Sequence, residues 1–150
     1  MKKQLFPHGV FAAYCLMMLT LLFHRAGYEP NLAYADQLRW NLIPFHTIRL
    51  YWRAFWSGSP SLRMISVINL GGNIIMFIPL GFLLPPVFPK LKNLTSVLVT
   101  TAAIIICVEL IQLLTLLGSC DIDDLILNLI GAASGYWLYT KFCKNACSDK

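Results

Sequence analysis

Four long apolar stretches follow one another along the chain, separated by polar connections. They lie at about residues 9–23, 64–84, 94–118 and 125–142. A helix rises ~1.5 Å per residue, so ~20 apolar residues cross the hydrocarbon layer of a bilayer. The pattern therefore predicts an all-α membrane protein, built as a bundle of about four transmembrane helices.

The stretch at residues 9–23 is the shortest and has two interpretations. It follows Lys2 and Lys3, as the apolar region of a signal peptide would. However, no A-x-A-like cleavage site follows Phe23, where the sequence continues with polar residues. We interpret the stretch as a retained span, with cleavage as a signal peptide as the alternative.

A fifth segment, at residues 44–57, has a different pattern. Its sequence PFHTIRLYWRAFWS, wound as a helix, gathers aromatic and aliphatic side chains on one side and Arg49 and Arg53 on another. This arrangement is typical of an amphipathic helix that lies in the membrane interface. Its arginines could anchor the helix by snorkelling, or bind a phosphate or carboxylate in bidentate fashion.

Composition agrees with this class. Of the 150 residues, 57% are hydrophobic and 13% charged, which is too apolar for a soluble domain of this size. We predict one membrane domain over residues 1–150. The net charge of +5 does not indicate nucleic acid, because the basic residues are scattered between the apolar stretches and form no stripe.

The lysines determine the predicted orientation. If the N-terminus is cytoplasmic, every lysine falls on the cytoplasmic side and every arginine on the opposite side. The short connections at residues 85–93 and 119–124 agree with this choice, whereas the arginine-bearing loop at residues 24–63 departs from the positive-inside rule. We predict cytoplasmic N- and C-termini and an extracytoplasmic interfacial helix.

Glu109 is the one acidic residue inside the stretch at residues 94–118, where Gln112 follows about one turn later. A carboxylate at membrane depth costs roughly 2.5–3.5 kcal/mol on insertion scales, so it usually has a partner or a function. Counted along the helices at ~1.5 Å per residue, Asn73 of the preceding span lies at about the same depth. The two side chains are therefore expected to be neighbours.

Further polar residues begin the fourth span. Asp121, Asp124 and Asn128 have the spacing that places side chains on one helix face, provided that the helix begins early enough. We expect a polar cleft that opens outward. Its candidate ligand-binding residues are Asn73, Glu109, Gln112, Asp121, Asp124 and Asn128.

These residues also have structural interpretations. Asp123 or Asp124 could cap the fourth helix, and Glu109 could simply hold the bundle together through a hydrogen bond to one of the asparagines. Gly131 and Gly135 form a G-x-x-x-G pair, which is typical of a close helix-packing face.

An intramembrane enzyme that acts on a lipid or lipid-linked cell-wall substrate is the alternative function. Glu109 is the candidate general acid or base, and Asp121 and Asp124 are weak candidates for a divalent cation because the loop lacks EF-hand spacing. No Ser, Cys or Lys stands beside a convincing base. We therefore favour binding over catalysis and predict no cofactor.

Four phrases of the sequence occur together in a known family. They are NLIPF at residues 41–45, GNIIMFIPLGFLLP at 72–85, VELIQ at 108–112 and DIDDLILNLIGAASG at 121–135. In this order and spacing they resemble the VanZ-like family of bacterial integral membrane proteins. Members commonly carry a basic residue shortly before the acidic motif, where this chain reads Gly118-Ser119-Cys120.

The resemblance implies a role in the bacterial envelope, since the name-giving member is associated with resistance to glycopeptide antibiotics, notably teicoplanin. It supplies no agreed reaction, so the site is argued from its own residues. We expect a multi-pass protein of the bacterial cytoplasmic membrane, with membrane lipids as partners. Its ligand would be a lipid-linked envelope precursor or a lipoglycopeptide antibiotic, whose anionic groups meet Arg49 and Arg53. Self-association is left open.

Overall fold

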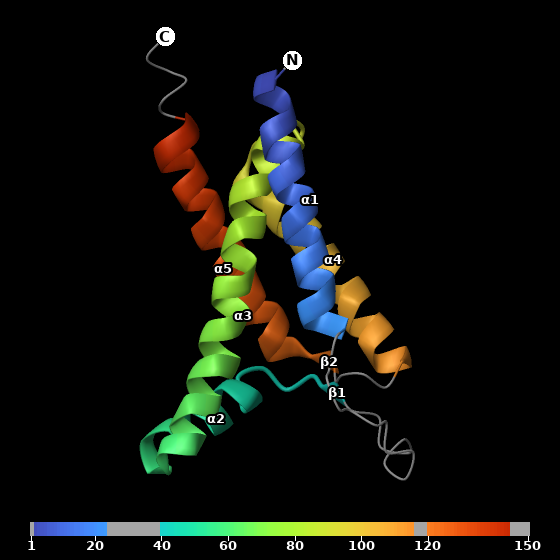
Figure 1. The fold of residues 1–150 in the computed structure, drawn as a ribbon. Coiled ribbons are helices and arrows are strands. Elements are labelled where there is room, and N and C mark those ends of the chain that lie inside the picture. Colours follow the sequence, from blue (N-terminus) through green and yellow to red (C-terminus); the bar gives the residue numbers. More distant parts are fainter. Residues whose placement is uncertain (1, 24–39, 116–119, 145–150) are drawn as a thin grey trace.

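The computed structural model describes residues 2–23, 40–115 and 120–144, and these are almost entirely helical (Figure 1). The helices are α1 (Lys2–Phe23), α2 (His46–Ser57), α3 (Pro60–Val87), α4 (Leu94–Leu114) and α5 (Ile122–Tyr139), which continues into the π-helical turn η2 (Thr140–Lys144). Two short strands, β1 (Trp40–Asn41) and β2 (Cys120–Asp121), pair in parallel. The predicted all-α fold is confirmed.

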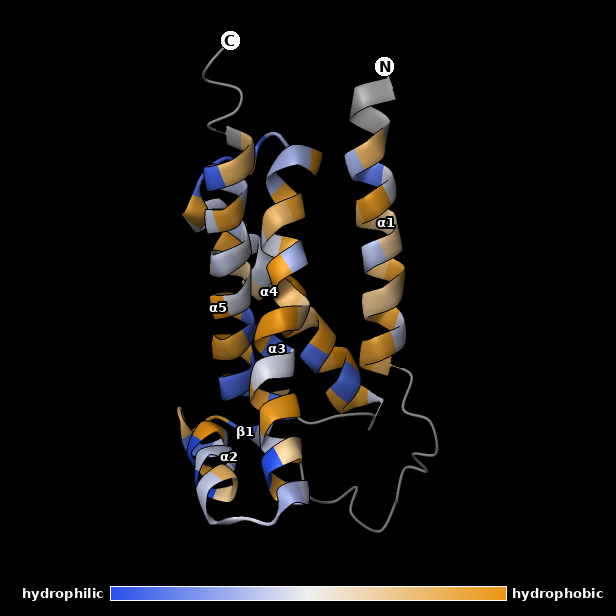
Figure 2. Cartoon of the chain, turned by 60° about the vertical axis from the view of Figure 1, so that its left-hand side comes forward, coloured by the Kyte–Doolittle hydropathy of each residue, from blue (hydrophilic) through white to orange (hydrophobic). Residues whose placement is uncertain are grey.

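Three of the described helices are long and apolar enough to cross a membrane. They are the Phe6–Phe23 part of α1, and α3 and α4 over their whole lengths. In Figure 2 the hydrophilic positions in the second half of α4 and the first turn of α5 lie toward the end of the bundle that holds α2. The predicted fourth span coincides with α5, which packs along α3, but its crossing of the membrane stays a prediction.

Helices α3 and α5 approach each other at glycines. A Cβ atom on Gly135 would lie 1.9 Å from the Ile78 carbonyl oxygen, and one on Gly81 would lie 1.9 Å from that of Ala132. Gly131 is equally constrained by the backbone of α3. The predicted packing face on α5 is therefore confirmed. The sequence did not reveal its counterpart on α3, which is Gly81.

Helices α1 and α4 complete the bundle. The Tyr14 hydroxyl on α1 donates a hydrogen bond of 2.9 Å to the Met76 carbonyl on α3. The core between the helices is apolar, and Leu84, Val97 and Ile105 are its most deeply buried aliphatic members. This core holds the four long helices in fixed relative positions, so polar side chains at matching heights can meet.

Helix α2 packs against α3 at the end of the bundle that also holds β1 and β2 (Figure 1). The amphipathic helix predicted at residues 44–57 is present, but its aromatic side is divided. Phe55 is half-buried, whereas Trp52 and Trp56 are exposed, because α3 covers only part of that side. The position of α2 in a membrane interface stays a prediction.

Helix α1 begins, and η2 ends, at the same end of the bundle (Figure 1). The connection between α3 and α4, which carries Lys90 and Lys92, also lies at that end. Helix α2, with Arg49 and Arg53, lies at the opposite end. This arrangement is the one that the predicted topology requires, although the side of the membrane on which each end lies stays a prediction.

Candidate functional site

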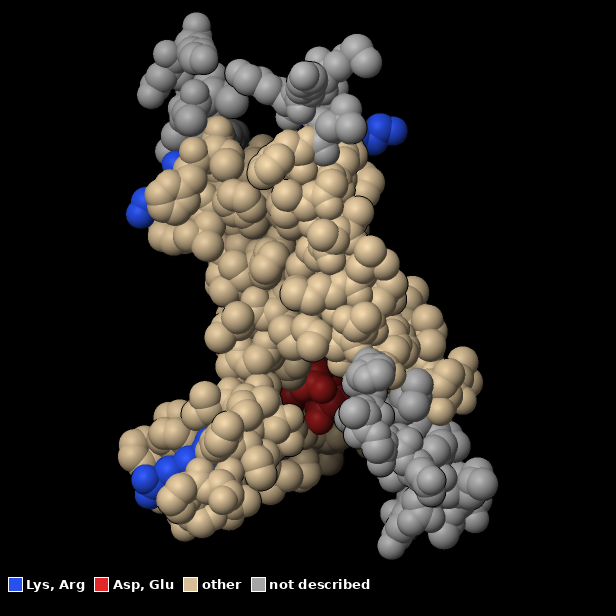
Figure 3. Space-filling view, viewed as in Figure 1, with Lys and Arg blue, Asp and Glu red and all other residues tan. Residues whose placement is uncertain are grey.

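A pocket of about 250 Å³ opens between α1, α3, α4 and α5. One part of its wall is apolar and another part is polar. The apolar residues are Leu21, Leu22, Met76, Phe77, Ile105 and Val108, and the polar ones are Asn69, Asn73, Glu109, Gln112, Asp124 and Asn128. On the face shown in Figure 3, acidic side chains lie in a recess toward the end of the bundle that holds α2.

Glu109 lies in this wall with 8% of its surface exposed. Its Oε2 atom accepts a hydrogen bond of 3.3 Å from the thiol of Cys120, which lies in β2. Its Oε1 atom is buried and has no hydrogen-bond partner among the described residues. The structural interpretation that pairs Glu109 with Asn73 or Asn128 is therefore wrong, because the Asn73 amide donates to Asp124 and the partner of Glu109 is Cys120.

The other amides and the second carboxylate surround the same space. The Asn73 amide on α3 donates a hydrogen bond of 2.6 Å to Asp124 Oδ1, at the start of α5. Gln112 donates one of 2.9 Å to the Leu22 carbonyl on α1. Asn128 is 6% exposed, and its Oδ1 atom is buried without a partner in the described structure. Asn73 and Glu109, which counting along the helices placed at about the same depth, both line this pocket.

Asp121 has a different environment from Asp124. It is the N-cap of α5, and its Oδ1 atom accepts a hydrogen bond of 2.9 Å from the Asp123 amide. Its carboxylate also accepts bonds of 2.6 Å from the Thr47 hydroxyl and 3.3 Å from the Asn41 amide. The expected common face of Asp121 and Asp124 required the helix to begin early enough to include residue 121, and this condition is not met, because α5 begins at Ile122 and Asp121 has extended backbone angles.

Asp123 is fully buried and caps a helix other than its own. Phe45 stands at the N-cap of α2, in a left-handed conformation (φ 64°), and its side chain has no acceptor. Asp123 supplies the missing acceptors. Its two carboxylate oxygens bind the Phe45 and Ile48 amides at 2.5 and 3.0 Å. A carboxylate at a helix N-terminus satisfies free N–H groups and complements the helix dipole.

Asp121 and Asp124 also affect the pKa of Tyr51, which lies on the half-buried side of α2. Burial, and then the negative charges of Asp124 and Asp121, raise the pKa of the Tyr51 phenol. The phenol therefore stays neutral and α2 adds no negative charge of its own to that of the aspartates. The groups of α2 that meet the aspartates are therefore neutral. The Thr47 hydroxyl bonds to Asp121, and the Ile48 amide bonds to Asp123.

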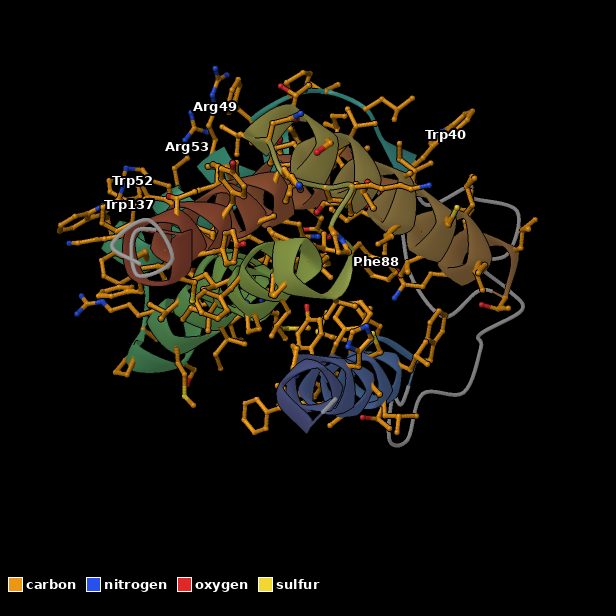
Figure 4. The ribbon with its side chains drawn as sticks, turned by 90° about the horizontal axis from the view of Figure 1, so that it is seen from above. Trp40, Arg49, Trp52, Arg53, Phe88 and Trp137 are labelled. Carbon is orange, nitrogen blue, oxygen red and sulfur yellow. The ribbon has the colours of Figure 1, made fainter. Side chains whose placement is uncertain are left out.

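Arg49 and Arg53 are exposed on the opposite side of α2 and do not line the pocket. Figure 4 shows both side chains pointing outward from the bundle, near Trp52. The structure therefore separates the predicted ligand-binding residues into an acidic pocket and a basic outer surface. Whether either binds a ligand stays a prediction.

Asp121 and Asp124, the weak candidates for a divalent cation, have different hydrogen-bond partners. In the described part of the chain, no group of three or more His, Cys, Asp or Glu side chains is arranged to hold a metal ion. The polar groups of this pocket are thus two carboxylates and several amides.

Sequence reasoning missed Cys120, Asn41 and Thr47 as neighbours of the acids. Asn41 begins the phrase at residues 41–45 that carries part of the family resemblance, and this is the only signal that could have pointed to it. Cys120 lies in β2, which pairs with β1 and contacts α4, and a two-residue pairing leaves no readable pattern in the sequence.

The environment of Cys120 leads to a test of its reactivity. Burial, and then the hydrogen bond and charge of Glu109, raise its pKa to about 11 from the ordinary value of 9.0. The thiolate is the reactive form, so at neutral pH roughly 100-fold less of it is present. In a variant with Cys120 as its sole cysteine, we expect iodoacetamide to react slowly at pH 7.5, and faster as pH rises toward 11.

Glu109→Gln in the same background is expected to lower the pKa of Cys120 and speed the reaction at pH 7.5, because the negative charge is lost. An alkylation rate at pH 7.5 equal to that of an unstructured cysteine peptide would contradict the predicted environment. An unchanged pH profile in Glu109→Gln would show that the two side chains do not interact.

A comparison with protein families matched most of the chain. The family model described as VanZ/LLP1 covers residues 10–144, which include every residue that lines the pocket. Neither the curated proteins nor the solved structures gave a match.

Proposed function

This chain belongs to the VanZ-like family, a family of membrane proteins linked to glycopeptide resistance, and from this premise we propose that its acidic pocket binds one group of an amphiphilic envelope molecule. The molecule is a lipid-linked cell-wall precursor or a lipoglycopeptide antibiotic. Binding holds the molecule at the membrane and shields the bound group from other molecules that would bind it. The pocket faces the extracytoplasmic side in this proposal.

The pocket itself is the observation that carries the proposal. Glu109 Oε1 and Asn128 Oδ1 are buried in its wall without partners in the described structure. An unsatisfied buried polar group costs ~1–3 kcal/mol, and more when it is charged. A ligand that bonds to these atoms satisfies them and removes this cost.

The volume of the pocket limits how much of the ligand can enter it. Pockets that enclose a drug-sized molecule have volumes of ~300–1,000 Å³, and this one has about 250 Å³. A glycopeptide or a lipid-linked precursor is far larger than that. The pocket therefore takes one group of the molecule, and the rest lies against the outside of the helices or in the lipid.

Cys120 favours binding over catalysis at this place. It is the thiol beside Glu109, and an acyl-transfer enzyme would use such a group as its nucleophile. Burial and the hydrogen bond to Glu109 raise its pKa to about 11, so the thiol stays protonated at neutral pH. Cys120 therefore lacks the lowered pKa by which many catalytic cysteines are activated, so in an enzyme Glu109 would have to remove its proton.

The test compares strains that lack the chain with strains that carry the wild type, Glu109→Gln or Cys107→Ala. We expect the wild type to protect against teicoplanin more than against vancomycin, because only teicoplanin carries an acyl chain. Loss of one hydrogen bond to a charged group costs ~1.5–3 kcal/mol, or roughly 10- to 100-fold in affinity. Glu109→Gln should therefore lose most of the protection at equal expression.

Cys107→Ala is the matched control, since Cys107 lies on the same helix two residues before Glu109 but is exposed. It should protect as the wild type does. Full protection by Glu109→Gln would exclude the pocket from the function. Equal susceptibility of strains with and without the wild-type chain would exclude the antibiotic as the ligand.

A further inference from the structure

We propose that the group which enters the pocket is a primary ammonium, carried on the polar end of an amphiphile and paired with Glu109. This inference rests on the proposed function, because it specifies the chemistry of the group that the pocket takes. It follows from which polar atoms are already bonded, from the charge of the wall and from the volume.

Three polar side chains at the pocket already donate a hydrogen bond to another group of the protein. The Asn73 amide donates to Asp124, the Gln112 amide donates to Leu22, and the Cys120 thiol donates to Glu109. The two buried atoms of the pocket that have no partner in the described structure are Glu109 Oε1 and Asn128 Oδ1, and both are acceptors. A ligand that satisfies these two buried atoms must therefore supply hydrogen-bond donors.

The charge of the wall selects a cation. Glu109 and Asp124 line the pocket, and its described lining residues include no Lys, Arg or His. A phosphate or carboxylate would add negative charge beside two carboxylates, and like charges at close range repel each other. An anionic part of the same ligand is suited to the outer side of α2, where Arg49 and Arg53 are exposed.

The number of donors selects a primary ammonium among cations. Such a group has three N–H donors, which can serve Glu109, Asn128 and Asp124 together. A quaternary ammonium carries the same charge without any N–H. The apolar side of the pocket, with Met76, Phe77 and Ile105, suits the methylene groups next to the nitrogen.

The volume agrees with this group. About 250 Å³ holds an amino-alkyl end but not a whole lipid or antibiotic. Two sources share this chemistry, namely an aminophospholipid headgroup and the amine of another amphiphile.

The experiment titrates the purified full-length chain, in detergent micelles, with decylammonium, decyltrimethylammonium and decyl phosphate, and follows thermal unfolding. We expect decylammonium to raise the unfolding temperature of the wild type and of Cys107→Ala. Its affinity for Glu109→Gln and Asn128→Ala should be at least ~10-fold weaker, since each loses a bond to the ammonium. Decyltrimethylammonium and decyl phosphate should have no comparable effect.

Stabilisation by decyltrimethylammonium equal to that by decylammonium would overturn the inference, because charge alone would then explain binding. Preference for decyl phosphate would overturn it too. Both comparisons use the wild-type protein, so they hold even if a variant does not fold. In nanodiscs, competition for decylammonium by phosphatidylethanolamine but not by phosphatidylglycerol would identify a lipid source, and its absence would identify another amphiphile.

The two proposals fail separately. If decylammonium does not bind while Glu109→Gln abolishes protection against teicoplanin, the ammonium inference is wrong and the proposed function stands. If decylammonium binds through Glu109 while Glu109→Gln protects fully, the pocket takes an ammonium and the antibiotic role is wrong.

Discussion

Gly135→Ala is expected to destabilise the folded bundle by about 3 kcal/mol, which is the upper part of the usual range for overpacking a close contact. The added Cβ would lie 1.9 Å from the Ile78 carbonyl oxygen and 2.9 Å from the Phe82 nitrogen. Both atoms are backbone, so no side chain can move aside and α3 and α5 must separate. A large drop in the unfolding temperature of the detergent-solubilised protein would show this.

Gly71→Ala is the matched control for this substitution. Gly71 lies on α3, and a Cβ built on it meets nothing within 4 Å. Because alanine is favoured over glycine in a helix by roughly 0.5–1 kcal/mol, this variant should be as stable as the wild type or slightly more so. Equal unfolding temperatures for Gly135→Ala and Gly71→Ala would refute the close approach of α3 and α5.

Asp123→Ala is expected to cost ~2–4 kcal/mol, because it removes both acceptors that hold the N-terminus of α2. The Phe45 and Ile48 amides would then be left without the carboxylate that binds them. Helix α2 should detach from α5, and trypsin should cleave after Arg49 and Arg53 much faster. Cleavage rates and unfolding temperature together measure the effect.

Two variants control this prediction. Asp123→Asn keeps one oxygen acceptor but loses the charge, so its stability should fall between those of Asp123→Ala and the wild type. Asp124→Asn alters the neighbouring carboxylate, which bonds to Asn73 on α3 and not to α2. It should leave tryptic cleavage of α2 unchanged. If Asp123→Ala is cleaved no faster than Asp124→Asn, the capping role of Asp123 is refuted.

The position of Glu109 shows how far helix geometry carries a prediction. The rise per residue fixes depth along a span, so Asn73 and Glu109 could be assigned to the same level, with Gln112 about one turn further on, and all three line the pocket. Depth says nothing about direction around the helix axis, however. The Glu109 carboxylate therefore has a partner, Cys120, that no count along the helices could find.

The aspartates at the start of α5 show where local reasoning ends. A cap at this place was expected, because Asp is favoured there. The cap of α5 is Asp121, whereas Asp123 caps α2, which lies far away in the sequence. That role depends on the packing of the two segments against each other, to which the pairing of β1 with β2 contributes.

The sequence alone was enough to predict the all-α membrane class, the order and approximate positions of the helices, the glycine face on α5 and the family, although α1, α3 and α5 begin before the apolar stretches do. These properties follow from local hydropathy, from helix period and from short motifs. The tertiary structure decided which side chains meet: Gly81 against α5, Cys120 against Glu109, and Asp123 against α2. Such contacts depend on rotation about helix axes and on connections between distant segments, and the packing of the whole bundle fixes both.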